Sequence, residues 1–169
     1  MTSEVIPDSF RRAFAAAQKA SVQKKKNVAH GVVATSATAA AAAGASPIPF
    51  SDAVILVPIQ IGMLAGISST FGLQLSTAFL STLVAAAAGA TGATFAGRAI
   101  VSNLLKFIPG AGTVAGGAIS AATAAALTTT LGEIYIATLV ALFSDTGGEP
   151  PYSDDVAREF KKRLGKKNA

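Results

Sequence analysis

The chain has 169 residues, enough for one domain with a hydrophobic core and too few for two domains of ordinary size. It is 51% hydrophobic and 14% charged, whereas an average soluble domain is about 25% charged. It contains no cysteine, which excludes disulfide frameworks, thiolate metal sites and a cysteine nucleophile. The formal net charge is +5, and it comes from two basic ends around a middle that is almost free of charge.

Charged residues are scarce between residues 27 and 144. Within that block the formally charged residues are Asp52, Arg98, Lys106 and Glu133. Basic residues stand on either side of it, and clusters of this kind are attracted to anionic lipid. The basic residues that we expect at a membrane surface are Lys24, Lys25, Lys26, Lys161, Lys162 and Arg163.

The first predicted element is an amphipathic helix over residues 9–26, with Phe10 and Phe14 on one face and the basic residues mostly elsewhere. Ser9 can cap this helix, because a serine hydroxyl accepts a hydrogen bond from the backbone of the first turn. The helix continues or kinks into the alanine-rich stretch 27–45.

Two turns rich in proline and glycine follow along the chain. Proline has no backbone N–H and displaces the residue before it from helical geometry, so helices end at these turns. Asp52 stands where the next helix begins and would meet the positive end of the helix dipole. The predicted turn and cap residues are Pro47, Pro49, Asp52, Pro109, Gly110 and Gly112.

Three further apolar helices are predicted over residues 52–71, 73–107 and 113–143. A linker over residues 145–152 leads to a final short helix that Ser153 caps. The apolar stripe of this last helix consists of Val156, Phe160 and Leu164.

The predicted fold class is therefore all-α, with four apolar helices forming two hairpins between an amphipathic N-terminal helix and a short C-terminal helix. The corresponding segments are 1–26, 27–144, 145–152 and 153–169.

The two hairpins resemble each other. A shift of sixty positions places Ile48-Pro49 on Ile108-Pro109 and residues 67–72 on residues 127–132. Either an internal duplication or the self-similarity of alanine-rich sequence explains this match. In both halves we expect the second helix to end or bend at the glycine that closes the matched segment.

Length permits membrane insertion, since a spanning helix needs about 20 mostly apolar residues. Small residues at four-residue spacing let helices approach closely, either in lipid or in a tightly packed soluble bundle. Charge scarcity favours lipid, because a soluble bundle needs a polar outer face on each helix. The predicted packing glycines are Gly62, Gly66, Gly89, Gly97 and Gly116.

An even number of apolar helices puts both basic termini on one side of a membrane, which the positive-inside tendency makes the cytosolic side. The N-terminus lacks the pattern of a secretory signal. Hairpins that only dip into the cytosolic leaflet fit the same pattern. We expect the membrane, at its cytoplasmic face, with the cytoplasm as the alternative location.

The sequence contains no recognisable catalytic set. The stretch GAGTVAGGAIS has the glycines of a phosphate-binding loop but no lysine. His30, the only histidine, has no acid near it in the sequence and is interpreted as a partly solvated helix residue. Asp52 and Glu133 are either an intramembrane acidic pair or, as we prefer, a helix cap and a bundle-facing or end-of-span acid. We expect no catalytic residue, cofactor, metal or nucleic-acid partner.

Two stretches, PIPFSDAVILVPIQIGMLAGI and LLKFIPGAGTVAGGAISAATAAALTTTLGEIYI, resemble the bacterial GTPase-associated helical domain family of the YcjF type, domain of unknown function six-nine-seven. The resemblance covers about residues 24–143. It implies a membrane-associated helical module that localises or responds to a GTPase, which would act in trans because this chain lacks the GTPase domain. The family has no established catalytic residues, and its matching positions look architectural: Pro47, Pro49, Asp52, Pro58, Pro109, Gly110, Gly112 and Gly132.

The leading hypothesis is a non-enzymatic, membrane-associated helical module that acts as an anchor, scaffold or remodelling partner and forms homo-oligomers through its small-residue faces. The first alternative is a soluble helical interaction module that docks a GTPase. The second is a pore-forming protein whose charge-poor hairpin inserts after a soluble state.

Overall fold

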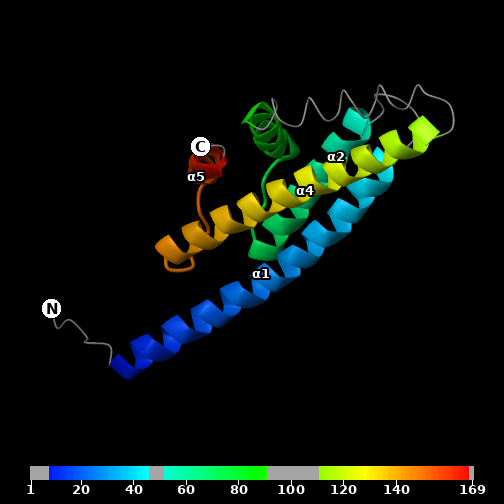
Figure 1. Cartoon of the computed structure of the whole chain (residues 1–169). Helices are drawn as coiled ribbons and strands as arrows, with labels where there is room; N and C mark the ends of the chain where they lie inside the picture. The colour runs from blue at the N-terminus through cyan, green and yellow to red at the C-terminus, as the bar shows by residue number, and fades with distance from the viewer. Residues whose placement is uncertain (1–7, 46–51, 91–110, 168–169) are drawn as a thin grey trace.

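The computed structural model describes residues 8–45, 52–90 and 111–167 (Figure 1). Five helices and no strand occur within those ranges, which confirms the all-α fold. They are α1 (Asp8–Gly44), α2 (Asp52–Phe71), a helix at Thr77–Ala90, α4 (Ala111–Asp145) and α5 (Ser153–Lys167).

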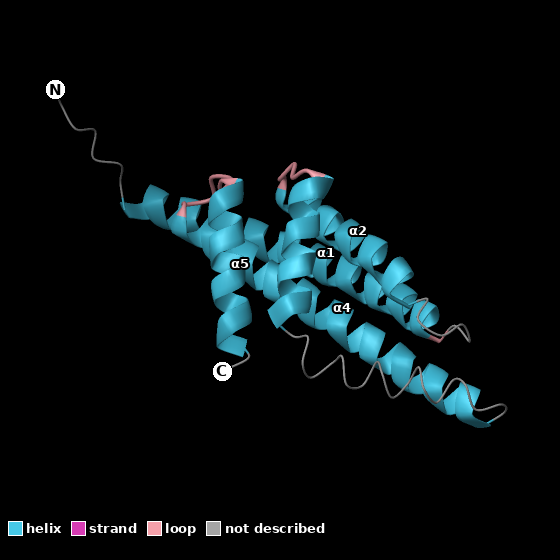
Figure 2. Cartoon of the chain, turned by 90° about the horizontal axis from the view of Figure 1, so that it is seen from above, coloured by secondary structure: helices cyan, strands magenta, loops and turns pink. Residues whose placement is uncertain are grey.

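Three long helices run along one another. Helix α1 packs against both α2 and α4, and the chain direction of α1 opposes that of the other two (Figure 1). The C-terminal end of α1 therefore lies beside the N-terminal ends of α2 and α4. The Thr77–Ala90 helix and α5 lie side by side across these long helices (Figures 1 and 2).

One hydrophobic core joins all five helices. Each helix contributes apolar side chains three, four or seven residues apart, the spacing that places them on one face. On α5 that face is the stripe predicted from the sequence, since Val156, Phe160 and Leu164 are all buried. Burial of one such side chain stabilises the fold by roughly 1.5–3 kcal/mol, so α5 belongs to the bundle and is not an appended tail.

The turn after α2 is a glycine-closed helix end. Gly72 has a φ of 82°, a left-handed conformation that glycine adopts without strain. The amide of Gly72 donates to the carbonyl of Ser69, and the amide of Leu73 donates to that of Ser68. These two bonds occupy carbonyls that the helix leaves unpaired, and Leu73 packs into the core beneath them.

The next helix begins later than residue 73. The hydroxyl of Ser76 accepts a 3.2 Å hydrogen bond from the amide of Phe79, as an N-cap does, and the helix starts at Thr77. The remainder of the predicted helix over residues 73–107 lies mostly outside the described residues.

Helix α1 runs unbroken from Asp8 to Gly44, across the predicted segment boundary between residues 26 and 27, so the predicted N-terminal helix continues into the alanine-rich stretch. The stretch contains neither proline nor an internal glycine cap, and α4 and α2 pack against its apolar half. The amphipathic segment and the first apolar helix are therefore one element.

The two halves of the sequence repeat differ in structure. Gly72 ends α2, whereas its counterpart Gly132 lies inside α4, which continues to Asp145. The expected helix end or bend at Gly132 is therefore absent. A side chain on Gly132 would meet Val33 of α1 at 2.5 Å and Met63 of α2 at 3.1 Å. This glycine serves close helix packing, and it has no role as a cap.

Candidate functional site

One end of the bundle is poor in charge: within the described residues Asp52, the first residue of α2, is the charged residue that stands there. We call it the apolar end and define it as residues 31–44 of α1, 53–66 of α2 and 113–132 of α4. These segments contain no acidic, basic or histidine residue, and Figure 1 shows them at the same end of the bundle. The largest exposed hydrophobic side chains on this end are Ile55, Val57 and Ile119, which are 42%, 44% and 39% exposed.

The apolar end is long enough to enter a bilayer. At 1.5 Å per residue, the 14 residues of α1 measure about 21 Å and the 20 residues of α4 about 30 Å. The hydrocarbon core of a bilayer is about 30 Å thick. Insertion from this end would therefore carry the helices past the middle of the bilayer.

Three threonine hydroxyl groups on the apolar end have acceptors inside their own helices, whereas the buried hydroxyl of Thr128 has no partner within the described chain. The side chains of Thr35 and Thr38 each donate a 3.0 Å hydrogen bond to the carbonyl four residues earlier. Thr123 donates to the carbonyl of Ile119 at 2.8 Å. Donors paired in this way need no water, which is the condition that hydrocarbon imposes on polar groups.

Close backbone contacts hold α1 against α4 at the apolar end. A Cβ on Gly44 would lie 2.8 Å from the carbonyl oxygen of Ser120, and one on Gly117 would lie 3.3 Å from that of Ala45. Only glycine permits backbones to approach so closely. Neither Gly44 nor Gly117 is among the packing glycines predicted from four-residue spacing.

A hydrogen-bonded pair of side chains, His30 and Glu133, marks the inner limit of the apolar end. His30 Nδ1 of α1 lies 2.8 Å from Glu133 Oε1 of α4, across 103 positions of sequence. Both side chains are partly exposed, at 37% and 44%. His30 is a partly exposed helix residue, as predicted. Its acidic partner is distant in sequence, and the packing of α1 on α4 brings the two together.

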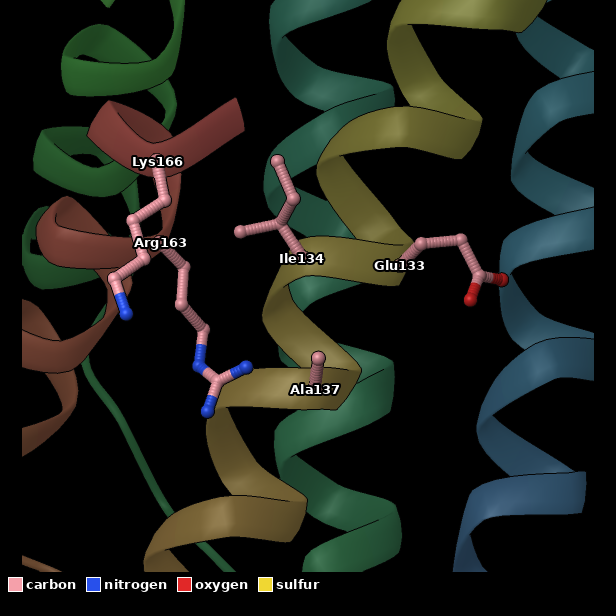
Figure 3. Close-up of a pocket in the computed structure, with 5 residues that line it drawn as sticks. All are labelled: Glu133, Ile134, Ala137, Arg163 and Lys166. Atoms are coloured by element: carbon pink, nitrogen blue, oxygen red, sulfur yellow. The ribbon is translucent and has the colours of Figure 1, made fainter. Parts of the chain in front are cut away.

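A pocket of about 360 Å³ lies next to this pair, between α4 and α5. Its lining residues are Glu133, Ile134, Ala137, Arg163 and Lys166. Figure 3 shows Arg163 extending from α5 toward Ala137 of α4 and Lys166 running alongside α5, whereas the carboxylate of Glu133 points away, toward α1. The pocket is basic on its α5 side and has an apolar wall on α4.

Glu159 of α5 pairs with basic side chains of the same helix, including Arg163 of the pocket. Its carboxylate lies 2.8 Å from Arg163 Nε and 3.3 Å from Lys162 Nζ. Burial raises the pKa of Glu159, but the hydrogen bond and charge of Lys162 and the charge of Arg163 outweigh burial, so the pKa lies below its ordinary value. The carboxylate therefore stays ionised and orients Arg163.

One helix among the described residues is long and apolar enough to cross a membrane. It is the segment Gly116–Asp145 of α4, with a mean hydropathy of 1.6, and half of it is buried in the bundle. The chain also matches a family described as Domain of unknown function (DUF697) over residues 10–164. The chain belongs to the DUF697 family.

One curated relative of this DUF697 chain is Magnetosome membrane protein 22 of Magnetospirillum gryphiswaldense. The two are 29% identical over 109 residues, which cover 64% of this chain and 56% of the relative. This chain thus spans little more than half the length of that protein. No solved structure matches the chain significantly.

The predicted turn residues of this DUF697 chain are only partly described. Pro47, Pro49, Pro109 and Gly110 lie outside the described residues. Helix α2 begins at Asp52, and Gly112 falls in the first turn of α4. Proline 58 lies inside α2, which continues through it.

The predicted packing glycines fall into different environments. Gly66 faces Val32 of α1 at 3.1 Å, and Gly116 is buried. A Cβ on Gly62 or Gly89 would meet nothing within 4 Å, so neither glycine packs against another helix of the described chain. Four-residue spacing defines a stripe of small residues, but it does not tell which stripe faces a neighbour. Gly97 lies outside the described residues.

The predicted surface lysines also differ. Lys25 reaches the C-terminal end of α2, where its Nζ lies 3.4 Å from the carbonyl oxygen of Phe71 and 5.2 Å from the ring centre of Phe143. Lys24, Lys161 and Lys162 are exposed, while Lys26 and Arg163 are half-buried. The basic side chains thus surround the end of the bundle opposite the apolar end.

Sequence reasoning missed a buried hydroxyl pair. The oxygens of Tyr135 of α4 and Ser68 of α2 lie 2.7 Å apart, and Ser68 donates to the carbonyl of Leu64, which leaves Tyr135 as the donor between them. Tyr135 also meets Phe160 of α5 edge-on, with ring centres 5.9 Å apart. Tyrosine and serine in an apolar run are the available signal, but pairing them requires the fold. Tyr152, by contrast, is 82% exposed.

Proposed function

We propose that this DUF697 chain is a non-enzymatic, membrane-associated helical module whose apolar end inserts into the bilayer from its cytosolic face. In that position it acts as an anchor, scaffold or remodelling partner at the membrane. The relative's printed name, a magnetosome membrane protein, supports the membrane part of this proposal.

The observation that carries the proposal is the separation of charge along the bundle. The segments of the apolar end contain no charged residue and expose three large aliphatic side chains. Asp52 stands at the tip of this end as the first residue of α2, and the other charged residues of the described chain lie from His30 and Glu133 toward the opposite end. Water would solvate a soluble bundle equally at both ends and would not favour this separation. A bilayer does, because the charges remain at the headgroups while the apolar end enters hydrocarbon.

This position gives α5 a defined role. The helix lies across the long helices, so insertion along their direction would lay α5 along the membrane surface (Figure 2). Its buried stripe keeps it attached to the core, and its exposed lysines would face the headgroup region. Each lysine or arginine near an anionic surface contributes about 1 kcal/mol of attraction.

A GTPase in trans is the partner that the family resemblance implies, and self-association through small-residue faces is a second proposed interaction. Gly62 and Gly89 support self-association, because both are exposed and unused within the described chain. Co-purification with a GTPase encoded beside this chain tests the first interaction, and chemical cross-linking in membranes tests the second.

Carbonate extraction of membranes tests the proposal as a whole. An inserted bundle stays in the pellet after the alkaline wash, whereas a peripheral protein is released. Quantitative release of the chain into the supernatant contradicts the proposal. Leakage of dye from liposomes distinguishes an anchor from a pore, since an anchor leaves the trapped dye inside.

The second candidate function is a soluble interaction module that docks a GTPase. The buried core favours it: half of the long apolar segment of α4 is already covered by other helices, as in the core helix of a soluble protein. This candidate predicts a single homogeneous species in the absence of detergent, which gel filtration measures directly.

A further inference from the structure

The α4–α5 pocket combines two basic side chains with an apolar wall. Arg163 and Lys166 come from α5, and Ile134 and Ala137 come from α4. The pocket is a shallow hollow of about 360 Å³ that is open to solvent. Its lining residues on α4, Glu133 to Ala137, span about one helical turn, and Glu133 stands directly after the last residue of the apolar end.

The one acid that lines the pocket does not neutralise it. Glu133 binds His30 at 2.8 Å, and Figure 3 shows its carboxylate on the α1 side of α4, away from Arg163 and Lys166. The histidine thus holds the acid outside the pocket. Within the described part of the chain, Lys166 has no ion-pair partner.

Arg163 is positioned but retains unused donors. Its Nε is buried and lies 2.8 Å from Glu159, yet it forms no aligned hydrogen bond there. The contact with Glu159 orients the Arg163 side chain. Figure 3 shows its terminal guanidinium nitrogens near Ala137. A guanidinium group offers paired N–H donors that match two oxygens of a phosphate, and a lysine adds a mobile positive charge.

We propose that this pocket binds the phosphate group of an anionic phospholipid. The two basic residues hold the phosphate, and the apolar wall of Ile134 and Ala137 accommodates the start of the acyl region. This assignment rests on the proposed insertion of the apolar end, which brings the pocket to headgroup level. A soluble phosphate lacks the apolar part and would leave that wall uncovered.

Flotation of the full chain with vesicles tests the site. The vesicles contain phosphatidylcholine alone or phosphatidylcholine with phosphatidylglycerol, and the pocket variant carries Arg163→Gln with Lys166→Gln. The matched control carries Arg158→Gln with Lys161→Gln, which removes one arginine and one lysine from exposed positions of α5 outside the pocket. Circular dichroism verifies that both variants remain helical.

Both variants lose general attraction to the anionic vesicles, by about thirtyfold for two charges. The pocket variant loses at least about tenfold more than the control, because it also loses charge-assisted hydrogen bonds. Equal losses overturn the pocket. On phosphatidylcholine alone, both variants bind as the unmodified chain does.

Inorganic phosphate separates the two sources of the ligand. Millimolar phosphate, compared with sodium chloride of equal ionic strength, leaves flotation of the unmodified chain unchanged if the pocket recognises the lipid. Displacement by phosphate alone overturns the lipid assignment. Failure of the unmodified chain to float with either vesicle overturns the proposed function itself, which distinguishes that failure from failure of the pocket alone.

Discussion

A lysine in place of Val57 tests the insertion of the apolar end. Val57 is 44% exposed on α2 and lies 14 residues before Phe71, whose carbonyl oxygen meets Lys25. At 1.5 Å per residue, Val57 is about 21 Å from the level of that lysine. If Lys25 marks the headgroups, Val57 lies beyond the middle of the hydrocarbon, which is about 15 Å deep per leaflet.

The expected cost follows from transfer energies. A lysine near the middle of the bilayer costs about 2.5–3.5 kcal/mol, and the replaced valine contributed a few tenths in favour of insertion. The total of about 3–4 kcal/mol lowers the partition constant into neutral vesicles by about 100- to 1000-fold. Because the side chain is exposed, the free energy of unfolding in water should change by no more than about 0.5 kcal/mol.

The assay is flotation with phosphatidylcholine vesicles, combined with thermal melting followed by circular dichroism. Tyr152→Lys is the matched control, since this exposed hydrophobic residue is far from the apolar end in sequence and precedes α5. It should bind vesicles as the unmodified chain does. Unchanged vesicle binding of a folded Val57→Lys variant would refute the insertion model.

Three further predictions concern the fold. Gly132→Val should destabilise the bundle by about 1–3 kcal/mol, because the new side chain would collide with Val33 and Met63. Gly62→Ala has open space around it and should stabilise α2 by up to about 1 kcal/mol. Denaturant unfolding measures both free energies, and equal effects would contradict the packing of Gly132. Tyr135→Phe should cost about 0.5–1.5 kcal/mol through the lost hydrogen bond to Ser68, and no loss would mean that the hydroxyl pair is energetically neutral. The pKa of Glu159 is lower in the folded chain than its ordinary value of 4.5, so its stabilising contribution is complete above pH 4.5 and disappears as the pH falls through the folded pKa. The melting temperatures of the unmodified chain and of Glu159→Gln should therefore differ above pH 4.5 and converge below it.

Much of the fold was predictable because its signals are local. The apolar stripe of α5, the end of α2 at Gly72 and the start of that helix at Asp52 depend on neighbours within one or two turns. The low charge of the middle of the chain was visible from composition. Each of these features is a property of a short segment and needs no partner.

The candidate site was less predictable because it is assembled from distant segments. His30 and Glu133 are 103 residues apart, and the pocket joins residues of α4 to residues of α5. Arg163 was expected at a membrane surface only as one charge among several. Its orientation by Glu159 and its position over Ala137 depend on how α5 crosses α4.

The sequence by itself determined an all-helical chain with an apolar middle between basic ends, because helix propensity, capping and hydrophobic spacing act within a few residues. Only the tertiary structure decided that these helices separate charge along the bundle and that Gly132 packs inside a helix while Gly72 ends one. The tertiary structure also places His30 beside Glu133, so the Glu133 carboxylate points away from Arg163 and Lys166. The physical reason is that contacts between helices depend on which faces meet, and the close packing of all five helices selects those faces together.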